Sequence, residues 1–203
     1  MISPAQLLAL VGHCDAEVIA PALSAAAADA EISTPRRLAH WLGQLAVESA
    51  GFNRMTENLN YSAERLCAVW PGRFPTTLAA QPFAHNPDAL ANRVYGGRLG
   101  NTEPGDGARY KGRGFIQITG RANYAKFGEL TGLDLVTHPD LAIMPDAAAR
   151  IAAAFWTAHG LNAMADADNI EGITRAINGG QNGLADRKEA VADAKVIFGI
   201  RSA

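Results

Sequence analysis

Residues 34–51 read Thr-Pro-Arg-Arg-Leu-Ala-His-Trp-Leu-Gly-Gln-Leu-Ala-Val-Glu-Ser-Ala-Gly, and this stretch predicts a helix with an acid on its apolar side. Thr34 has the side chain of an N-cap, and the proline that follows suits the first helical position. An apolar stripe recurs at helical spacing, made by Leu38, Trp41, Leu42 and Leu45. Glu48 lies three residues after Leu45 and therefore on the same stripe. Gly51 then ends the helix.

Two explanations account for an acid at position 48. A carboxylate on a buried face is costly unless it is paired, protonated or facing a cleft. Burial disfavours the charged form of a carboxyl group, which is what a general acid working near neutral pH requires. The alternative is a core glutamate neutralised by an arginine. The helix alone leaves both explanations open.

Composition indicates a single globular domain. The chain has 203 residues, of which 48% are hydrophobic, so it can bury the core of one compact domain over residues 1–203. The formal net charge is −2, and the basic excess expected of a nucleic-acid binder is missing. The two cysteines, Cys14 and Cys67, are too few for a disulfide framework, and we expect reduced thiols, with a single bridge as the alternative.

The N-terminal residues carry no basic region followed by an apolar stretch, so no cleavable secretion signal is visible. No stretch approaches the roughly 20 apolar residues needed to span a bilayer. We therefore expect synthesis in a bacterial cytoplasm, without membrane insertion. A substrate outside the cytoplasm would require another factor for access.

Helical patterns dominate the rest of the chain, and the expected class is mainly α with at most a short β-hairpin. We expect Pro21 in the first turn of a helix that ends near Ala30, and Asp168 as the cap of a later helix. Prolines and glycines break the segment from about 68 to 98 into short pieces, which predicts a small helical lobe inserted in the main domain. Residues 112–120 are the one strand-like piece, and alternation would place Gln117 and Thr119 on one face.

Metal and cofactor chemistry are disfavoured. The five histidines are widely separated, and neither a His-Glu-x-x-His motif nor paired cysteines are present, so we expect no metal site. The sequence also lacks a dinucleotide fingerprint, a phosphate-binding loop and a Gly-x-Ser-x-Gly elbow. We therefore expect no cofactor.

Carboxylate chemistry remains. Glu57 follows Glu48 by nine residues, in a polar segment that we expect to be a loop. Two acids in unlike environments can divide the roles of general acid and general base, as glycoside hydrolysis requires. A separation of roughly 6.5–9.5 Å would leave room for a water and imply inversion at the sugar carbon. The spacing alone is weak evidence, because an exposed loop glutamate is common.

The combined pattern resembles glycoside hydrolase family 19, the family of plant-type chitinases, and most closely its short phage and bacterial endolysin branch. Four blocks carry the resemblance, in order along most of the chain: residues 45–52 (Leu-Ala-Val-Glu-Ser-Ala-Gly-Phe), 57–62 (Glu-Asn-Leu-Asn-Tyr-Ser), 110–124 (Tyr-Lys-Gly-Arg-Gly-Phe-Ile-Gln-Ile-Thr-Gly-Arg-Ala-Asn-Tyr) and 177–183 (Ile-Asn-Gly-Gly-Gln-Asn-Gly). The Gly-Arg-Gly-x-Ile-Gln-x-Thr portion is the most specific.

This resemblance implies a lysozyme-like helical fold and an inverting mechanism. By position, Glu48 matches the general acid, Glu57 the general base, and Thr119 the hydroxyl residue that helps to hold the attacking water. Family residues that hydrogen-bond the sugars match Gln117, Asn123 and Asn178. The chain departs from many relatives in having Val47 where they carry histidine, and from plant members in lacking their disulfides and groove-lining loops.

Further candidates for substrate binding are aromatic and cationic. Tyr61 and Tyr124 could stack on sugar faces, or lie in the core with their hydroxyls bonded. Arg187, like Arg113, could pair with one of the acids or brace the fold. Asn178 precedes two glycines and could simply end a helix.

The expected function is that of an endolysin, a glycoside hydrolase that cleaves β-1,4 bonds of bacterial peptidoglycan. Its partners would be the glycan strands and a holin-type pore that gives access to the cell wall, and we expect a monomer. The alternatives are a chitinase acting on chitin oligomers and a wall-binding module without catalysis.

Overall fold

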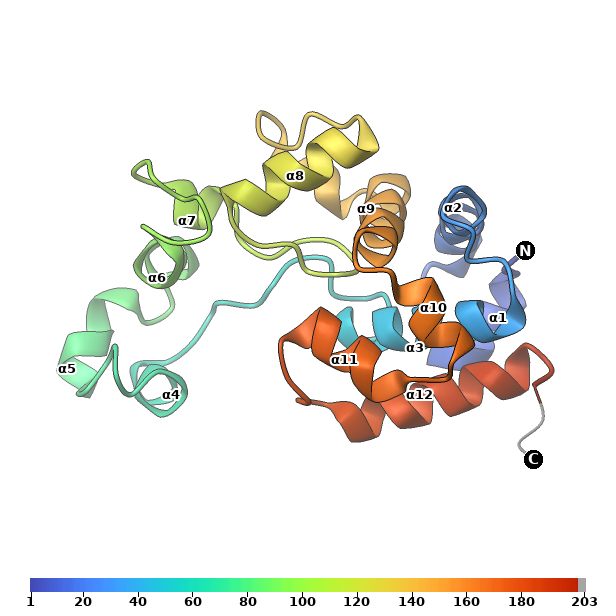
Figure 1. Cartoon of the computed structure of the whole chain (residues 1–203). Helices are drawn as coiled ribbons and strands as arrows, with labels where there is room; N and C mark the ends of the chain where they lie inside the picture. Colours follow the sequence, from blue (N-terminus) through green and yellow to red (C-terminus); the bar gives the residue numbers. More distant parts are fainter. Residues whose placement is uncertain (201–203) are drawn as a thin grey trace.

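The computed structural model describes residues 1–200, and these residues are mainly helical, as predicted (Figure 1). They form no sheet, only isolated bridges that pair Arg113 with Thr56 and with Ile118. The α-helices are α1 (Pro4–Val11), α2 (Ala16–Asp29), α3 (Pro35–Glu48), α4 (Ala63–Val69), α5 (Thr77–Ala80), α6 (Pro87–Tyr95), α7 (Asp106–Arg109), α8 (Arg121–Thr131), α9 (Pro145–Ala158), α10 (Leu161–Asp166), α11 (Ile170–Asn178) and α12 (Leu184–Ile197). Two 3-10 helices, η1 (Gln81–Phe83) and η2 (Pro139–Ile143), complete the set.

Two separate groups of buried apolar side chains hold the chain together. The larger group joins α1–α3 with α8–α11, and includes Trp41, as predicted, together with Trp156. The smaller group draws on residues 59–94, a wider span than the 68–98 expected from the sequence: Leu59, Leu66, Phe74, Ala80, Leu90, Ala91 and Val94. We call α4, η1, α5 and α6 around this second group the α4–α6 lobe. Figure 1 shows it on one side, with α1–α3 and α9–α12 on the other and α8 between them.

Helix α3 has the predicted bounds and the predicted buried stripe. The Thr34 hydroxyl accepts a hydrogen bond from the N–H of Arg37 at 3.2 Å, and Pro35 occupies the first position. The four apolar residues of the stripe are buried, and Glu48 is half-buried as the last helical residue. Gly51, with φ of 69°, closes the turn by donating to the carbonyl of Ala46 at 2.7 Å. The helix therefore delivers Glu48 at its end.

Helix α12 packs against α3 in the opposite direction, with nearly no space between the two backbones. A Cβ added to Gly43 would lie 2.6 Å from Cγ2 and 2.9 Å from the backbone nitrogen of Val191. At one end of this contact, His40 Nε2 and Lys195 Nζ both lie 2.6 Å from Oδ1 of Asp168. At the other end, the α12 residues one turn before Val191 reach the end of α3.

Helix α2 begins earlier than the sequence predicts. Pro21 is the sixth residue of α2, not a residue of its first turn. The helix extends ahead of the proline because Ala16, Ile19 and Ala20 are buried there, and this burial offsets the missing hydrogen bond. Among residues 1–200, no single helix is long and apolar enough to cross a membrane. Helices α1 and α2 have that length and apolar composition only when taken together, and they are bent by 106° at their junction.

The expected cap at Asp168 is wrong. Asn169 caps α11 instead, by accepting a hydrogen bond from the N–H of Gly172 at 2.9 Å. Asp168 has a positive φ of 57°, which turns its carboxylate toward His40 and Lys195. The side chain of Asp168 therefore forms long-range contacts with His40 and Lys195 instead of the helix cap that the local sequence pattern predicted.

The expected strand over 112–120 is also wrong. Only Arg113 and Ile118 pair with each other, and residues 114–117 between them form a tight turn. Phe115, Ile116 and Ile118 are all buried, so the segment does not alternate between two faces. Gln117 has φ of 52°, a left-handed conformation that breaks strand geometry.

We predict that Gly43→Ala destabilises the fold. Alanine gains about 1 kcal/mol over glycine in a helix interior. The added methyl group would overlap the backbone of Val191, which cannot rotate away, and overpacking of this kind costs about 1–3 kcal/mol. Urea unfolding should show a lower free energy of unfolding. Gly72→Ala is the control, because its Cβ would meet nothing within 4 Å. A Gly43→Ala protein as stable as wild type would contradict the close contact.

We also predict that His40 makes stability depend on pH. Burial lowers the pKa of His40 below its ordinary 6.5, although the hydrogen bond to Asp168 opposes this. A depressed folded-state pKa contributes stability that is complete above the unfolded-state value and lost as the pH falls through the folded-state value. The urea concentration at the unfolding midpoint should therefore decrease as the pH is lowered from about 7 to about 5. The decrease should be smaller in His40→Gln.

The titration of Asp168 does not contribute to the pH dependence in this range. Burial opposes the shift, but hydrogen bonds from Lys195 and His40 lower the pKa of Asp168 from its ordinary 3.8, so its contribution is lost only in more acid solution. Equal slopes for wild type and His40→Gln over the measured range would exclude His40 as the cause.

Candidate active site

Glu48 is held from α12 by a buried arginine. Nη2 of Arg187 donates to Oε1 of Glu48 at 2.5 Å, and Nη1 donates to Oε1 of Gln44 at 2.6 Å. Gln44 lies one turn before Glu48 on α3, and its amide donates to the hydroxyl of Thr174 at 3.4 Å. The side chain of Glu48 is 18% exposed, whereas that of Arg187 is 5% exposed. A planar guanidinium fixed by two acceptors therefore orients the carboxylate that solvent can still reach.

The structure corrects the expected sugar-binding role of Arg187. Both Nη groups are bonded within the protein, and the residue is buried between α3 and α12. Of the alternatives left open by the sequence, pairing with an acid is the one observed. Arg113 pairs with a different acid, since its Nη2 lies 2.9 Å from Oδ1 of Asp140 and not beside Glu48 or Glu57.

Glu57 lies in the predicted loop after α3 and is held by different means. Its backbone N–H donates to the carbonyl of Gly112 at 2.9 Å. In return the N–H of Gly112 donates to Oε1 of Glu57. The second oxygen, Oε2, accepts a hydrogen bond from the hydroxyl of Tyr95 at 2.7 Å. Each carboxylate oxygen thus has one donor, one from the backbone and one from the α4–α6 lobe.

Three oxygen-bearing side chains converge on Gly112. A Cβ added there would lie 3.2 Å from each of Glu57 Oε1, Gln117 Oε1 and Thr119 Oγ1. The sequence predicted that Gln117 and Thr119 face the same way because a strand alternates. They do meet, but through a turn in which Gln117 has positive φ. Glycine leaves the space among the three oxygens open.

Hydrogen bonds within residues 114–123 position these groups. The Thr119 hydroxyl donates to the carbonyl of Gln117 at 3.2 Å, and the amide of Asn123 donates to the carbonyl of Thr119 at 2.8 Å. The Gln117 amide donates to the carbonyl of Gly114 at 2.7 Å. Asn123 is therefore close to the site and half-buried, where it supports Thr119.

Tyr124 belongs to the core, which corrects its expected contact with substrate. It is 0% exposed, and its hydroxyl donates to the carbonyl of Lys111 at 2.7 Å while accepting from Arg113 at 3.1 Å. Burial raises the pKa of Tyr124 to about 12, although the guanidinium of Arg113 opposes the shift. The ring stays out of reach of a sugar and braces the loop instead.

The remaining two candidates lie near the surface. Tyr61 is half-buried in the α4–α6 lobe, with its ring edge-on to Trp70 at 5.4 Å between centroids. Asn178 is exposed at the last position of α11, and its amide donates to the carbonyl of Asn182 at 3.0 Å. The predicted helix end at Gly179 is confirmed.

Sequence reasoning missed three contributors: Gln44, Tyr95 and Gly112. Gln44 lies four residues before Glu48, a spacing that places both on one helix face and could have identified it. Nothing local connects Tyr95 to Glu57, because the two are 38 residues apart. Among residues 1–200, no three His, Cys, Asp or Glu side chains are grouped to hold a metal ion.

Comparisons with known sequences point to one family. Residues 83–179 match the sequence model of glycoside hydrolase family 19, described as chitinase class I. A glycosyl hydrolase family 19 domain-containing protein from Haemophilus influenzae is 42% identical over 151 residues, which cover 73% of this chain and 74% of that protein. An endochitinase from Arabidopsis thaliana is 42% identical over 95 residues, 45% of this chain and 31% of the plant protein.

Solved structures share the fold. A bacterial family 19 chitinase superimposes with a TM-score of 0.67 at 20% identity, over 98% of this chain and 96% of that one. Chitinase C from Streptomyces griseus also gives 0.67 at 20% identity, over 98% and 92% of the two chains. The predicted lysozyme-like helical fold is thereby confirmed.

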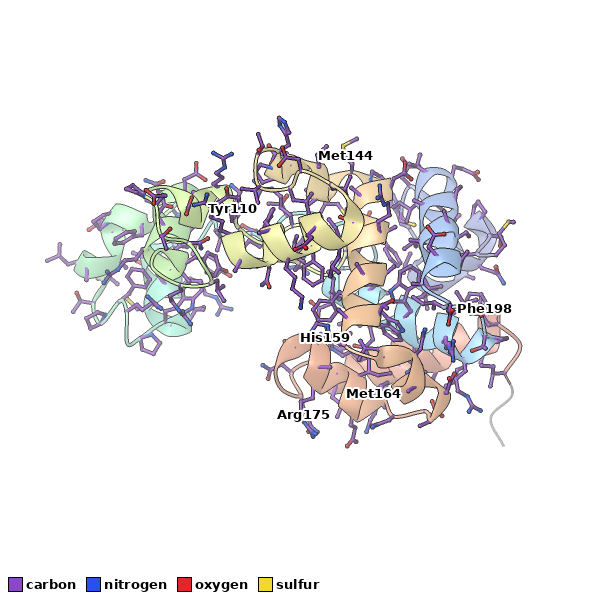
Figure 2. The ribbon with its side chains drawn as sticks, turned by 45° about the horizontal axis from the view of Figure 1, so that its top comes forward. Tyr110, Met144, His159, Met164, Arg175 and Phe198 are labelled. Carbon is purple, nitrogen blue, oxygen red and sulfur yellow. The ribbon has the colours of Figure 1, made fainter. Side chains whose placement is uncertain are left out.

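We predict that Arg187→Lys lowers the free energy of unfolding by about 1–3 kcal/mol, because one ammonium group cannot reproduce the two-pronged contact with Glu48 and Gln44. Urea unfolding measures the loss. Arg175→Lys is the matched control on the neighbouring α11, where the exposed Arg175 side chain points away from the molecule (Figure 2). The control should stay within about 0.5 kcal/mol of wild type. Equal effects of the two substitutions would argue against the buried bridge.

Proposed function

Because the chain belongs to glycoside hydrolase family 19, we propose that it is an endolysin that hydrolyses the β-1,4 bonds between the amino sugars of bacterial peptidoglycan. The observation that carries the proposal is that two glutamates have different surroundings. Glu48 is bound by a guanidinium at a helix end, and Glu57 is bound by a backbone amide beside Thr119. Unlike surroundings of this kind suit one general acid and one general base.

Glu48 acts as the general acid in this proposal. It gives its proton to the glycosidic oxygen as the bond to the anomeric carbon breaks. The carboxylate that remains is already bonded to Arg187, so its new negative charge forms against a fixed cation. The side chain needs little reorientation, because Gln44 holds the other prong of the guanidinium.

Glu57 acts as the general base. It takes a proton from a water in the space above Gly112, where its Oε1 is close to the oxygens of Thr119 and Gln117. The Thr119 hydroxyl donates to a backbone carbonyl and keeps its lone pairs free to accept from that water. Attack from the side opposite the leaving oxygen inverts the anomeric carbon. The exposed Asn178 and the half-buried Tyr61 are proposed to contact flanking sugars, with Asn123 and Gln117 nearer the water.

Peptidoglycan is proposed over chitin because the four sequence blocks resemble the short endolysin branch most closely and because the chain lacks the groove-lining loops of plant members. Chitin is the competing substrate, and the names of the plant relatives and of the solved structures favour it. Both polymers contain β-1,4-linked N-acetylated amino sugars, so the same two acids would serve either. We propose that the enzyme is made in the cytoplasm and that a holin-type pore, or lysis from within, gives it access to the cell wall.

We predict that Glu48→Gln loses at least about 100-fold of the hydrolytic rate and keeps its fold, since glutamine still accepts from Arg187 but has no proton to transfer. Turbidity loss of outer-membrane-permeabilised Gram-negative cells measures the rate, and thermal unfolding measures the fold. Glu189→Gln, an exposed acid on α12, is the control and should lyse cells like wild type. Full lysis by Glu48→Gln would remove Glu48 from the mechanism.

The substrate is decided by parallel assays with the wild-type protein. We expect lysis of permeabilised cells and little release of soluble sugars from chitin. Mass spectrometry of the released muropeptides identifies the sugar at the new reducing end. The anomeric configuration of that sugar, determined separately before the anomers interconvert, reports inversion. Rapid chitin hydrolysis without cell lysis would replace the endolysin by the chitinase.

A further inference from the structure

We propose that Tyr95 is a positioning residue that holds the carboxylate of Glu57 in the orientation needed to activate water. This inference rests on the proposed function. The Tyr95 hydroxyl donates to Oε2 at 2.7 Å, and the Gly112 amide donates to Oε1. Oε1 is the Glu57 oxygen that lies, with Thr119 Oγ1 and Gln117 Oε1, 3.2 Å from a Cβ added at Gly112. In this proposal the tyrosine binds Oε2, and Oε1, which lies close to Thr119, accepts the proton.

The Tyr95 hydroxyl comes from the α4–α6 lobe, whereas Gly112, Gln117 and Thr119 lie outside that lobe. Tyr95 is the last residue of α6, and the preceding turn is anchored in the lobe core by Leu90, Ala91 and Val94. The lobe therefore has a direct contact with the general base. This gives the lobe a role in catalysis in addition to any contact with substrate.

A buried asparagine fixes the position of Tyr95 relative to the segment that contains Thr119. Asn101 is 1% exposed, and its amide donates to the carbonyl of Tyr95 at 3.0 Å. The oxygen of the same carboxamide accepts from the N–H of Arg121 at 2.8 Å, two residues after Thr119. One side chain therefore ties the end of α6 to the start of α8. The positions of the tyrosine and of the threonine are set together.

The hydroxyl remains a donor throughout the working range of pH. Burial raises the pKa of Tyr95 above its ordinary value, and the neighbouring Glu57 carboxylate adds to the shift. A neutral phenol with one proton can donate only to the carboxylate it faces. Its loss would leave Oε2 without this partner and the carboxylate free to rotate.

The test is Tyr95→Phe, with Tyr110→Phe as the matched control. Tyr110 lies at the end of α7 (Figure 2), is buried, and donates its hydroxyl to the backbone carbonyl of Val136 at 3.0 Å. Both variants lose one hydroxyl from a buried ring, but only one loses a contact with Glu57. We expect Tyr95→Phe to lower kcat by about 10- to 100-fold with little change in KM. Tyr110→Phe should retain wild-type kcat.

The pH profile separates positioning from bracing. A donor to an ionised carboxylate favours that form, so its removal should move the acidic limb of the kcat profile to higher pH in Tyr95→Phe and not in Tyr110→Phe. In a Glu57→Gln background, Tyr95→Phe should cause no further loss of kcat, since residues that act as a unit are not additive.

Each other result has a defined meaning. A wild-type protein without hydrolytic activity would refute the proposed function, whatever Tyr95 does. An active wild type with an unchanged Tyr95→Phe profile would overturn the inference and leave the function standing. Lower kcat with an unmoved acidic limb, or a Tyr95→Phe protein that does not fold, would make the tyrosine a structural brace and also overturn the inference.

Discussion

The close approach of α3 and α12 is the constraint on which the site depends. Gly43 has no side chain at the point where Val191 crosses it, so the helices meet backbone to backbone. Any larger residue would separate them and withdraw Arg187 from Glu48. The same antiparallel contact aligns Lys195 with Asp168 and His40 at the far end. One missing side chain therefore sets the distance over which a buried guanidinium can hold a carboxylate.

The two acids are supported by opposite kinds of structure. Glu48 ends a long helix and takes its partner from another long helix, so its position is as rigid as their packing. Glu57 lies on a loop and takes its partners from a second loop and from the α4–α6 lobe. In the proposed mechanism, the acid is therefore held by packed helices and the base by hydrogen-bonded loops.

Local signals predicted α3 well and the 112–120 segment poorly. In α3 the cap, the proline and the apolar stripe all agree, and each acts over a few residues. In 112–120 the alternation was read as a strand, yet Phe115, Ile116 and Ile118 are all buried and the chain turns at Gln117. The motif residues still converge, because glycine at 112 lets three side chains approach one point. Residue types were informative where the predicted conformation was not.

By itself, the sequence determined the helical class, the bounds of α3 and the residue types proposed to carry the chemistry, since caps, periodicity and motifs are properties of neighbouring residues. The tertiary structure alone decided which partners those residues have. Arg187 reaches Glu48 across 139 positions, and Tyr95 reaches Glu57 across 38. It also placed Tyr124 in the core and turned Asp168 away from its expected cap. Pairings over such separations depend on how helices pack in space, and no local pattern encodes that packing.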